Sequence, residues 1–150
     1  MLAVLQFLSI VLAAIGMALS LAHALELPGK RRLDRDTYLA VQMIYAPGFA
    51  IGGFLGEACA ILATLTLAVF TPPGTTAFWL TIAALGCLLV EHAIFWLATQ
   101  PVNRFWGKPL PAGSDWTALR DRWEGSHLAR AVAAAAAFLL LLAAAIPART

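Results

Sequence analysis

The chain has 150 residues, of which 61% are hydrophobic and only 12% are charged, and its formal net charge is +2. Soluble domains average about 45–50% apolar and about 25% charged residues, so this composition excludes an ordinary soluble domain and favours a lipid environment. The small net charge gives no sign of a nucleic-acid partner, and the length fits a single domain.

The first predicted membrane helix covers about residues 1–27. A helix that spans a bilayer needs about 20 mostly apolar residues, and Gln6 is the only strongly polar residue before His23. The Ala-His-Ala sequence at residues 22–24 resembles the cleavage site of a secretory signal peptide. No Lys or Arg precedes the long apolar run, so we expect a membrane helix here.

A second helix is predicted over about residues 38–70, with a kink near residue 47. Asp34, Asp36 or Thr37 is of a type that caps a helix N-terminus, and the Pro-Gly pair at residues 47–48 indicates the kink. Glu57 interrupts the apolar part of this helix.

Small side chains recur every four residues on this second helix, and the first helix carries a similar stripe. The two stripes consist of Gly48, Gly52, Gly56, Ala60 and Thr64, and of Ser9, Ala13, Gly16 and Ser20. Membrane helices associate through such small faces because their backbones can then approach closely. We therefore expect both helices to pack along these stripes.

The turn-forming sequence TPPGTT separates the second helix from a third, predicted over about residues 77–100. A fourth helix is predicted over about residues 116–147, with Ser114 or Asp115 as its cap. The fold class is therefore all-α, an integral membrane four-helix bundle forming one domain. Cys59 and Cys87 lie in apolar runs, which argues against a disulfide framework or a CxxC metal site.

Basic residues gather in two of the connecting segments, after the first helix and after the third. They are Lys30, Arg31, Arg32 and Arg35, and Arg104, Lys108, Arg120 and Arg122. By the positive-inside rule both segments face the cytoplasm and both termini lie on the non-cytoplasmic side. We expect a multi-pass protein of the inner (plasma) membrane, in contact with the lipid bilayer.

Ionisable side chains interrupt all four predicted helices, mostly in the half nearest the basic segments. An ionisable residue inside a membrane costs about 2.5–3.5 kcal/mol on insertion scales, so each one needs a partner or a function. Glu57 and His92 lie at similar depths on the second and third helices. The other members of this polar cluster are His23, Glu26, Glu91, Glu124 and His127.

Three uses of the polar cluster remain open. First, His23, His92 and His127 could ligate haem, iron or copper, with Glu26 and Glu124 as further ligands. The Glu-x-x-His order typical of di-iron bundles occurs only at residues 124–127. Second, a Glu and a His could form an acid–base pair in a pocket without a cofactor. Third, ion pairs such as Glu57–His92 could simply hold the helices together.

Aromatic residues lie near the same depth as the polar cluster. Trp96 is one turn beyond His92 on the same helix face, and Asn103 continues that stripe. The tryptophans in this region could form an interfacial belt. Alternatively, Trp96 and Trp123 could hold a small aromatic or quinone-like ligand that enters from the cytoplasmic leaflet.

Three sequences carry a family resemblance: HALELPGKRRLD at residues 23–34, QPVNRFW at residues 100–106 and WTALRDRWEGSHLAR at residues 116–130. Together they resemble the anthrone-oxygenase-like family of small four-helix membrane proteins. The resemblance implies an integral membrane protein and, for some members, the oxidation of an anthrone to an anthraquinone by molecular oxygen.

If the resemblance extends to the reaction, His92 or Glu57 would remove a proton from the acidic methylene group of the substrate. Asn103 and Arg104 would stabilise the oxyanion, and Trp96 and Trp123 would hold the flat ring. The alternative is a non-catalytic haem- or metal-binding or scaffold subunit, in a homo-oligomer or a larger membrane complex.

Overall fold

The computed structural model describes residues 1–108 and 113–146, and these residues form helices joined by short loops. Within those ranges there is no strand. Among the described residues, four helical stretches are long and apolar enough to cross a membrane: α1 (Leu2–Lys30), α3 (Gly48–Phe70), Thr76–Asn103 and α6 (Trp116–Ala145). The predicted all-α, four-helix membrane architecture is confirmed, and the chain is a multi-pass membrane protein.

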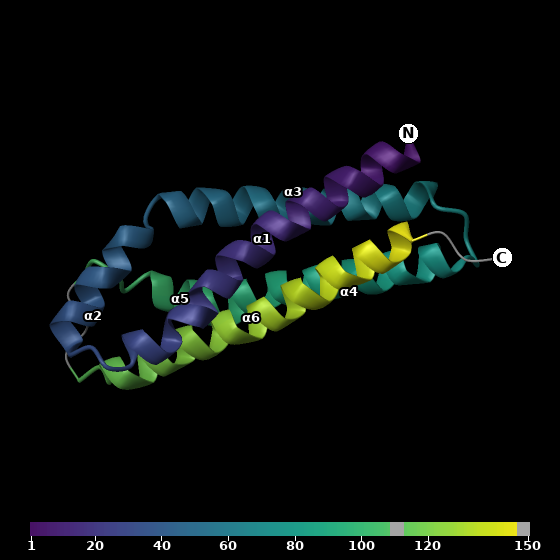
Figure 1. Ribbon diagram of the computed structural model, residues 1–150. Coiled ribbons are helices and arrows are strands. Elements are labelled where there is room, and N and C mark those ends of the chain that lie inside the picture. Colours follow the sequence, from purple (N-terminus) through teal and green to yellow (C-terminus); the bar gives the residue numbers. More distant parts are fainter. Residues whose placement is uncertain (109–112, 147–150) are drawn as a thin grey trace.

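Consecutive long helices run in opposite directions, so the bundle has an up-down-up-down arrangement (Figure 1). α1 packs along both α3 and α6, and α4 (Thr76–Ile94) packs along α6. α3 contacts α4 less extensively. Figure 1 shows α3 lying apart from α5 (Gln100–Asn103) at the end where α3 begins, beside α2 (Arg35–Gln42).

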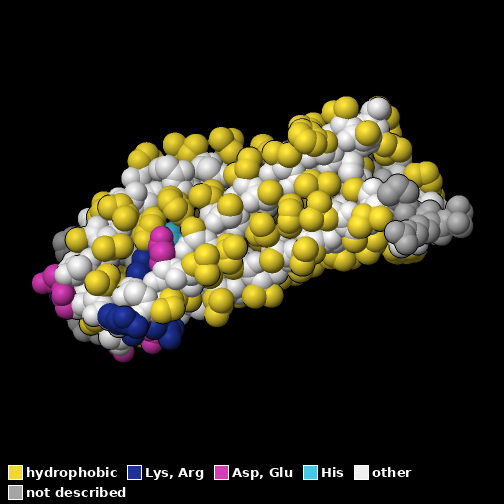
Figure 2. All heavy atoms as spheres, viewed as in Figure 1, with side chains coloured by type: hydrophobic (Ala, Val, Ile, Leu, Met, Phe, Trp, Pro, Cys, Tyr) yellow, Lys and Arg dark blue, Asp and Glu magenta, His cyan; other side chains and the backbone are white. Residues whose placement is uncertain are grey.

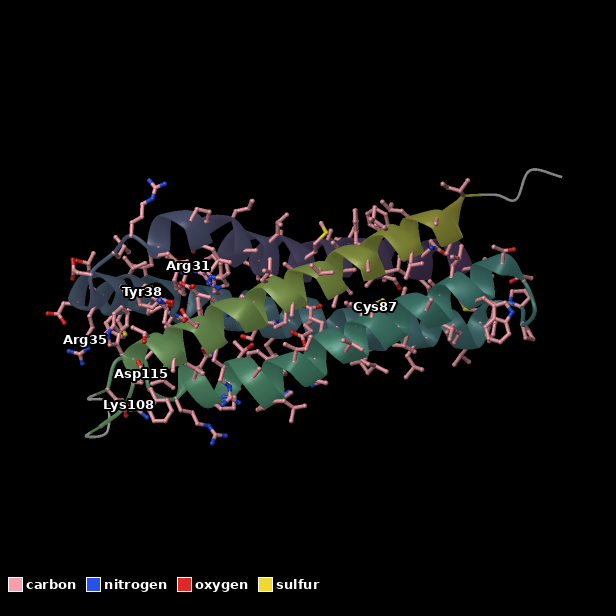
Figure 3. All side chains as sticks on the ribbon, turned by 90° about the horizontal axis from the view of Figure 1, so that it is seen from below. Arg31, Arg35, Tyr38, Cys87, Lys108 and Asp115 are labelled. Atoms are coloured by element: carbon pink, nitrogen blue, oxygen red, sulfur yellow. The ribbon has the colours of Figure 1, made fainter. Side chains whose placement is uncertain are left out.

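Charged side chains are concentrated at one end of the bundle. Figure 2 shows hydrophobic side chains over most of the visible face and charged side chains at the end where α2 lies. Figure 3 places Arg31, Arg35, Lys108 and Asp115 at that end, whereas the free thiol Cys87 lies along the middle of the bundle. The basic residues used to predict orientation therefore share one end. The side of the membrane that this end faces stays a prediction.

α1 continues to Lys30, one turn beyond its predicted end at about residue 27. Pro28 lies inside the last turn of the helix, where its missing N–H does not end the helix. Lys30 stabilises that turn, since its Nζ lies 3.0 Å from the Glu26 carboxylate and above the ring of Tyr45.

The predicted single helix over residues 38–70 is divided into separate elements. α2 is capped by Asp34, whose Oδ1 accepts a hydrogen bond from the Thr37 N–H at 3.0 Å. That backbone hydrogen bond holds the pKa of Asp34 below its usual value. A short 3-10 turn, Met43–Tyr45, follows, and Ala46 is extended. A residue before proline disfavours the helical conformation, so α3 starts anew after Pro47.

The third membrane helix passes through Pro101 and ends at Asn103, beyond the predicted end at about residue 100. A π-helical segment, Phe95–Thr99, leads into α5. Pro101 has no N–H to bond the carbonyl of Leu97, and Arg122 Nη2 on α6 donates to that oxygen at 2.7 Å. The freed carbonyl is thus satisfied, so the helix does not have to stop.

Asp115 caps α6, as one of the two residues predicted for that role. Its Oδ1 accepts hydrogen bonds from the N–H groups of Thr117 and Ala118. The Thr117 hydroxyl also donates to Oδ1, and this hydrogen bond holds the pKa of Asp115 below its usual value. The helix ends at Ala145. The predicted end at residue 147 lies outside the described residues.

The small-residue stripes of the first two membrane helices meet at Gly16 and Gly56. A Cβ atom placed on Gly56 would lie 3.0 Å from the backbone nitrogen of Gly16 and 3.1 Å from Ile15 Cγ2. Four residues of the α1 stripe are buried: Ser9, Ala13, Gly16 and Ser20. The predicted close packing of α1 and α3 is confirmed at this crossing.

Gly56→Ala is therefore expected to destabilise the bundle by about 1–3 kcal/mol, as overpacking usually does. The contact is with backbone atoms, which cannot rotate away. Thermal unfolding in detergent micelles measures the loss. Gly86→Ala on α4 is the matched control because nothing lies within 4 Å of a Cβ added there. Equal melting temperatures for the two variants would contradict the packing argument.

Candidate functional site

A cavity of about 340 Å³ lies inside the bundle, between α1, α3, α6 and the Phe95–Asn103 segment. Cavities of about 300–1,000 Å³ are typical of small-molecule sites. Aromatic rings form much of the wall, including those of Tyr45, Phe49, Phe95, Trp96, Trp106 and Trp123. Its ionisable lining side chains are His23, Glu57, His92, His127 and Arg130. The cavity thus joins the predicted aromatic group to much of the predicted polar cluster.

His92 is held between a carboxylate and an indole. Its Nδ1 lies 2.8 Å from Glu57 Oε1, and Trp96 Nε1 donates to His92 Nε2 at 3.0 Å. An indole N–H only donates, so Nε2 must be the accepting, unprotonated nitrogen. Nδ1 then carries the hydrogen and donates it to Glu57. The predicted Glu57–His92 contact is therefore present, and Glu57 selects one tautomer of the imidazole.

Arg130 joins two buried carboxylates from different helices. Its Nη2 donates to Glu57 Oε2 at 2.7 Å and lies 3.5 Å from Glu91 Oε1. Ser20 Oγ also donates to Glu91 Oε1, at 3.1 Å. The network links all four membrane-spanning stretches. Sequence reasoning gave Arg130 no role in the site, although an arginine within a membrane helix is itself a signal because it requires an anionic partner.

A second polar group lies on the same cavity. The imidazole rings of His23 and His127 have centroids 4.2 Å apart. His23 Nδ1 is 3.7 Å from Glu26 Oε2, too far for a hydrogen bond. That carboxylate oxygen instead accepts from the Tyr45 hydroxyl at 2.6 Å and pairs with Lys30 Nζ at 3.0 Å.

Tyr45 and Lys30 are members of this group that the sequence did not reveal. Lys30 is buried and lies 4.2 Å from the Tyr45 ring centroid and 4.8 Å from that of Trp123, a cation–π arrangement. Burial, together with the hydrogen bond to Glu26, raises the pKa of Tyr45. The hydroxyl therefore stays protonated and keeps donating to the carboxylate.

The five predicted metal ligands are not assembled into one group. His92 pairs with Glu57, and Glu124 pairs with Arg31 Nε at 2.8 Å. His23, Glu26 and His127 are the remaining three. Across residues 1–108 and 113–146, no three His, Cys, Asp or Glu side chains are arranged to hold a metal ion. Ligation of haem, iron or copper by the histidines stays a prediction without support from this arrangement.

Of the other predicted site residues, three line the cavity and one, Arg104, does not. Trp96, Trp123 and Asn103 line the cavity, as expected for ligand contacts. Asn103 Oδ1, however, already accepts from Trp123 Nε1 at 2.7 Å, and its Nδ2 donates to Gln100 at 3.3 Å. Arg104 is exposed and lies outside the lining of the cavity. The structure thus gives Arg104 no contact with a ligand there.

The cavity reaches the lipid-facing surface of the bundle. Two of its lining residues, Phe54 on α3 and Trp96, are 66% and 50% exposed. Both lie in membrane-spanning stretches, Phe54 on α3 and Trp96 in the π-helical segment that precedes α5. An apolar molecule dissolved in the bilayer would therefore meet this opening directly.

Comparison of the chain with protein-family models, curated proteins and solved structures finds no match. The resemblance to the anthrone-oxygenase-like family therefore stays a prediction.

Proposed function

We propose that the cavity binds a flat aromatic or quinone-like molecule from the membrane and that His92 acts on it as a general base. The observation that carries this proposal is the Glu57–His92 pair at an aromatic-lined cavity that opens toward lipid. Aromatic walls favour a flat ring, and a carboxylate-oriented imidazole is a recurrent proton acceptor in enzymes. We place the protein in the plasma membrane, with its charged end in the cytoplasm.

The reaction that fits this base is the oxidation of an anthrone. Nε2 of His92 takes one proton from the ring methylene, which leaves an electron-rich anion. The anion gives its electrons to molecular oxygen and forms a carbon–oxygen bond, and the proton returns to the resulting peroxide. Loss of one water then gives the ring carbonyl, so one anthrone and one O₂ yield one anthraquinone and one water.

Each neighbour of His92 has a defined part in this scheme. Glu57 accepts the Nδ1 hydrogen and so leaves Nε2 as the basic nitrogen. Arg130 neutralises the Glu57 charge within the apolar surroundings. Trp96 covers Nε2, and its half-exposed indole must turn away when substrate approaches.

The test is oxygen uptake by the purified protein in lipid nanodiscs supplied with anthrone. We expect one O₂ consumed for each anthraquinone formed, at a rate well above that of empty nanodiscs. Equal rates with and without the protein would refute oxygenase activity. A Soret absorption band or stoichiometric metal in the same preparation would instead favour the haem- or metal-binding alternative.

A further inference from the structure

Two of the cavity-lining residues that carry buried, unpaired polar atoms are neighbouring imidazoles; the full set in the described part of the chain is His23, Gln42, Trp106, His127 and Arg130. His23 and His127 are each only 5% exposed, and both line the cavity. Among the described residues, neither Nδ1 has a hydrogen-bond partner. Buried polar atoms in proteins are nearly always paired, so two adjacent unpaired imidazoles at a cavity point to a group that the cavity receives.

We infer that His23 and His127 bind an oxygen atom of the ligand, either a ring carbonyl or a phenolic hydroxyl, at a second position in the cavity. This inference rests on the proposed function because it concerns the same ligand. Each neutral imidazole offers one N–H donor and one acceptor nitrogen, which suits both kinds of oxygen. No proton is transferred at this position.

The surrounding groups leave these imidazoles available. Glu26, the carboxylate nearest to His23, is occupied by Tyr45 and Lys30. The aromatic neighbours Phe49 and Trp123 contact the edges and faces of the imidazoles, with centroids 4.9 and 5.0 Å from that of His23. These contacts fix the rings in place without using their nitrogen atoms.

The charges nearby favour an electron-rich oxygen. Arg130 lines the cavity and pairs with Glu57, whereas Lys30 lies outside the lining, above the ring of the lining residue Trp123. In an anthrone, the carbonyl lies across the central ring from the reacting methylene and becomes the oxyanion when His92 removes the proton. The imidazole pair thus takes the role that sequence reasoning assigned to Asn103 and Arg104, and it selects ring ketones and phenols over plain hydrocarbons.

Binding of two probes tests the inference. Anthrone and dihydroanthracene have the same ring skeleton, but only anthrone has the carbonyl oxygen. Quenching of tryptophan fluorescence in nanodiscs gives both affinities, with oxygen excluded. The wild-type protein is expected to bind anthrone about tenfold more tightly, the effect of one or two hydrogen bonds. In the double variant His23→Phe/His127→Phe this preference disappears, while the affinity for dihydroanthracene is retained.

Phenylalanine preserves the ring packing, and a thermal-unfolding scan confirms that the double variant folds. Gly86→Ala is the control and keeps the preference for anthrone, because Gly86 lies outside the cavity lining and has room for the added Cβ. Equal affinity of the wild-type protein for the two probes, or an unchanged preference in the double variant, overturns this inference alone. Failure of the wild-type protein to bind either probe overturns the proposed function as well.

Discussion

Arg130→Met is expected to lower the free energy of unfolding by about 3–5 kcal/mol, the largest loss among the single substitutions considered. Methionine fills much of the same space but leaves Glu57 and Glu91 buried without their shared cation. Two uncompensated carboxylates in an apolar interior are costly because neither water nor another charge replaces the guanidinium. Unfolding in mixed micelles of mild and denaturing detergent measures the change.

A matched control is Arg122→Met, which removes an arginine of the same helix that donates to the Leu97 carbonyl from an exposed position. Its expected loss is about 0.5–1.5 kcal/mol, the contribution of one hydrogen bond, because no buried charge is left without a partner. Adding Glu57→Gln and Glu91→Gln to Arg130→Met should restore much of the stability by removing the unpaired charges. Wild-type stability of Arg130→Met would show that the network contributes little.

Glu57→Gln is expected to lower anthrone turnover by about 10²–10⁴-fold while changing the affinity for anthrone much less. Glutamine can present either an oxygen or an amide N–H to His92 Nδ1. The amide N–H would favour the opposite tautomer, in which Nε2 carries the hydrogen and cannot accept a proton. Steady-state oxygen uptake, together with the fluorescence titration, separates turnover from binding.

Glu91→Gln provides the comparison for that experiment. Glu91 shares Arg130 with Glu57, but its hydrogen bond is to Ser20 and it makes none to His92. This variant should keep most of the turnover, since the imidazole remains oriented. If Glu91→Gln and Glu57→Gln lost activity equally, the two carboxylates would be acting only through the charge network, and the tautomer argument would fail.

The membrane spans were predictable from hydropathy, whereas the helix ends near prolines were not. The predicted kink near Pro47 is a complete break in the helix, whereas Pro28 and Pro101 lie within helices. A proline frees one carbonyl oxygen, and the outcome depends on whether another group reaches it. At Leu97 that group is Arg122, which is 25 residues distant in sequence and brought close only by tertiary packing.

Depth within the membrane was predictable for the site, but rotation about each helix axis was not. Counting residues from the same end placed Glu57 level with His92, and the structure joins them. The same counting could not show that Glu91 turns toward Ser20 and Arg130, or that Glu124 turns toward Arg31 and away from the cavity. Those directions depend on how the four helices are rotated against one another.

The crossing of α1 and α3 at Gly16 and Gly56 bears on two properties of the cavity, the position of its base and the width of its opening. Gly56 adjoins Glu57 in the sequence. The contact between Gly56 and the Gly16 backbone therefore fixes the position, along the helix axis, of the carboxylate that orients His92. The first two turns of α3 also contribute to the cavity wall, and the exposed side chain of Phe54 lies at the opening. Changes in side-chain bulk at Phe54 can therefore alter which molecules enter while leaving the base in place. The exposed side of one turn of α3 would then control entry to the cavity, while its buried side holds the carboxylate that orients His92.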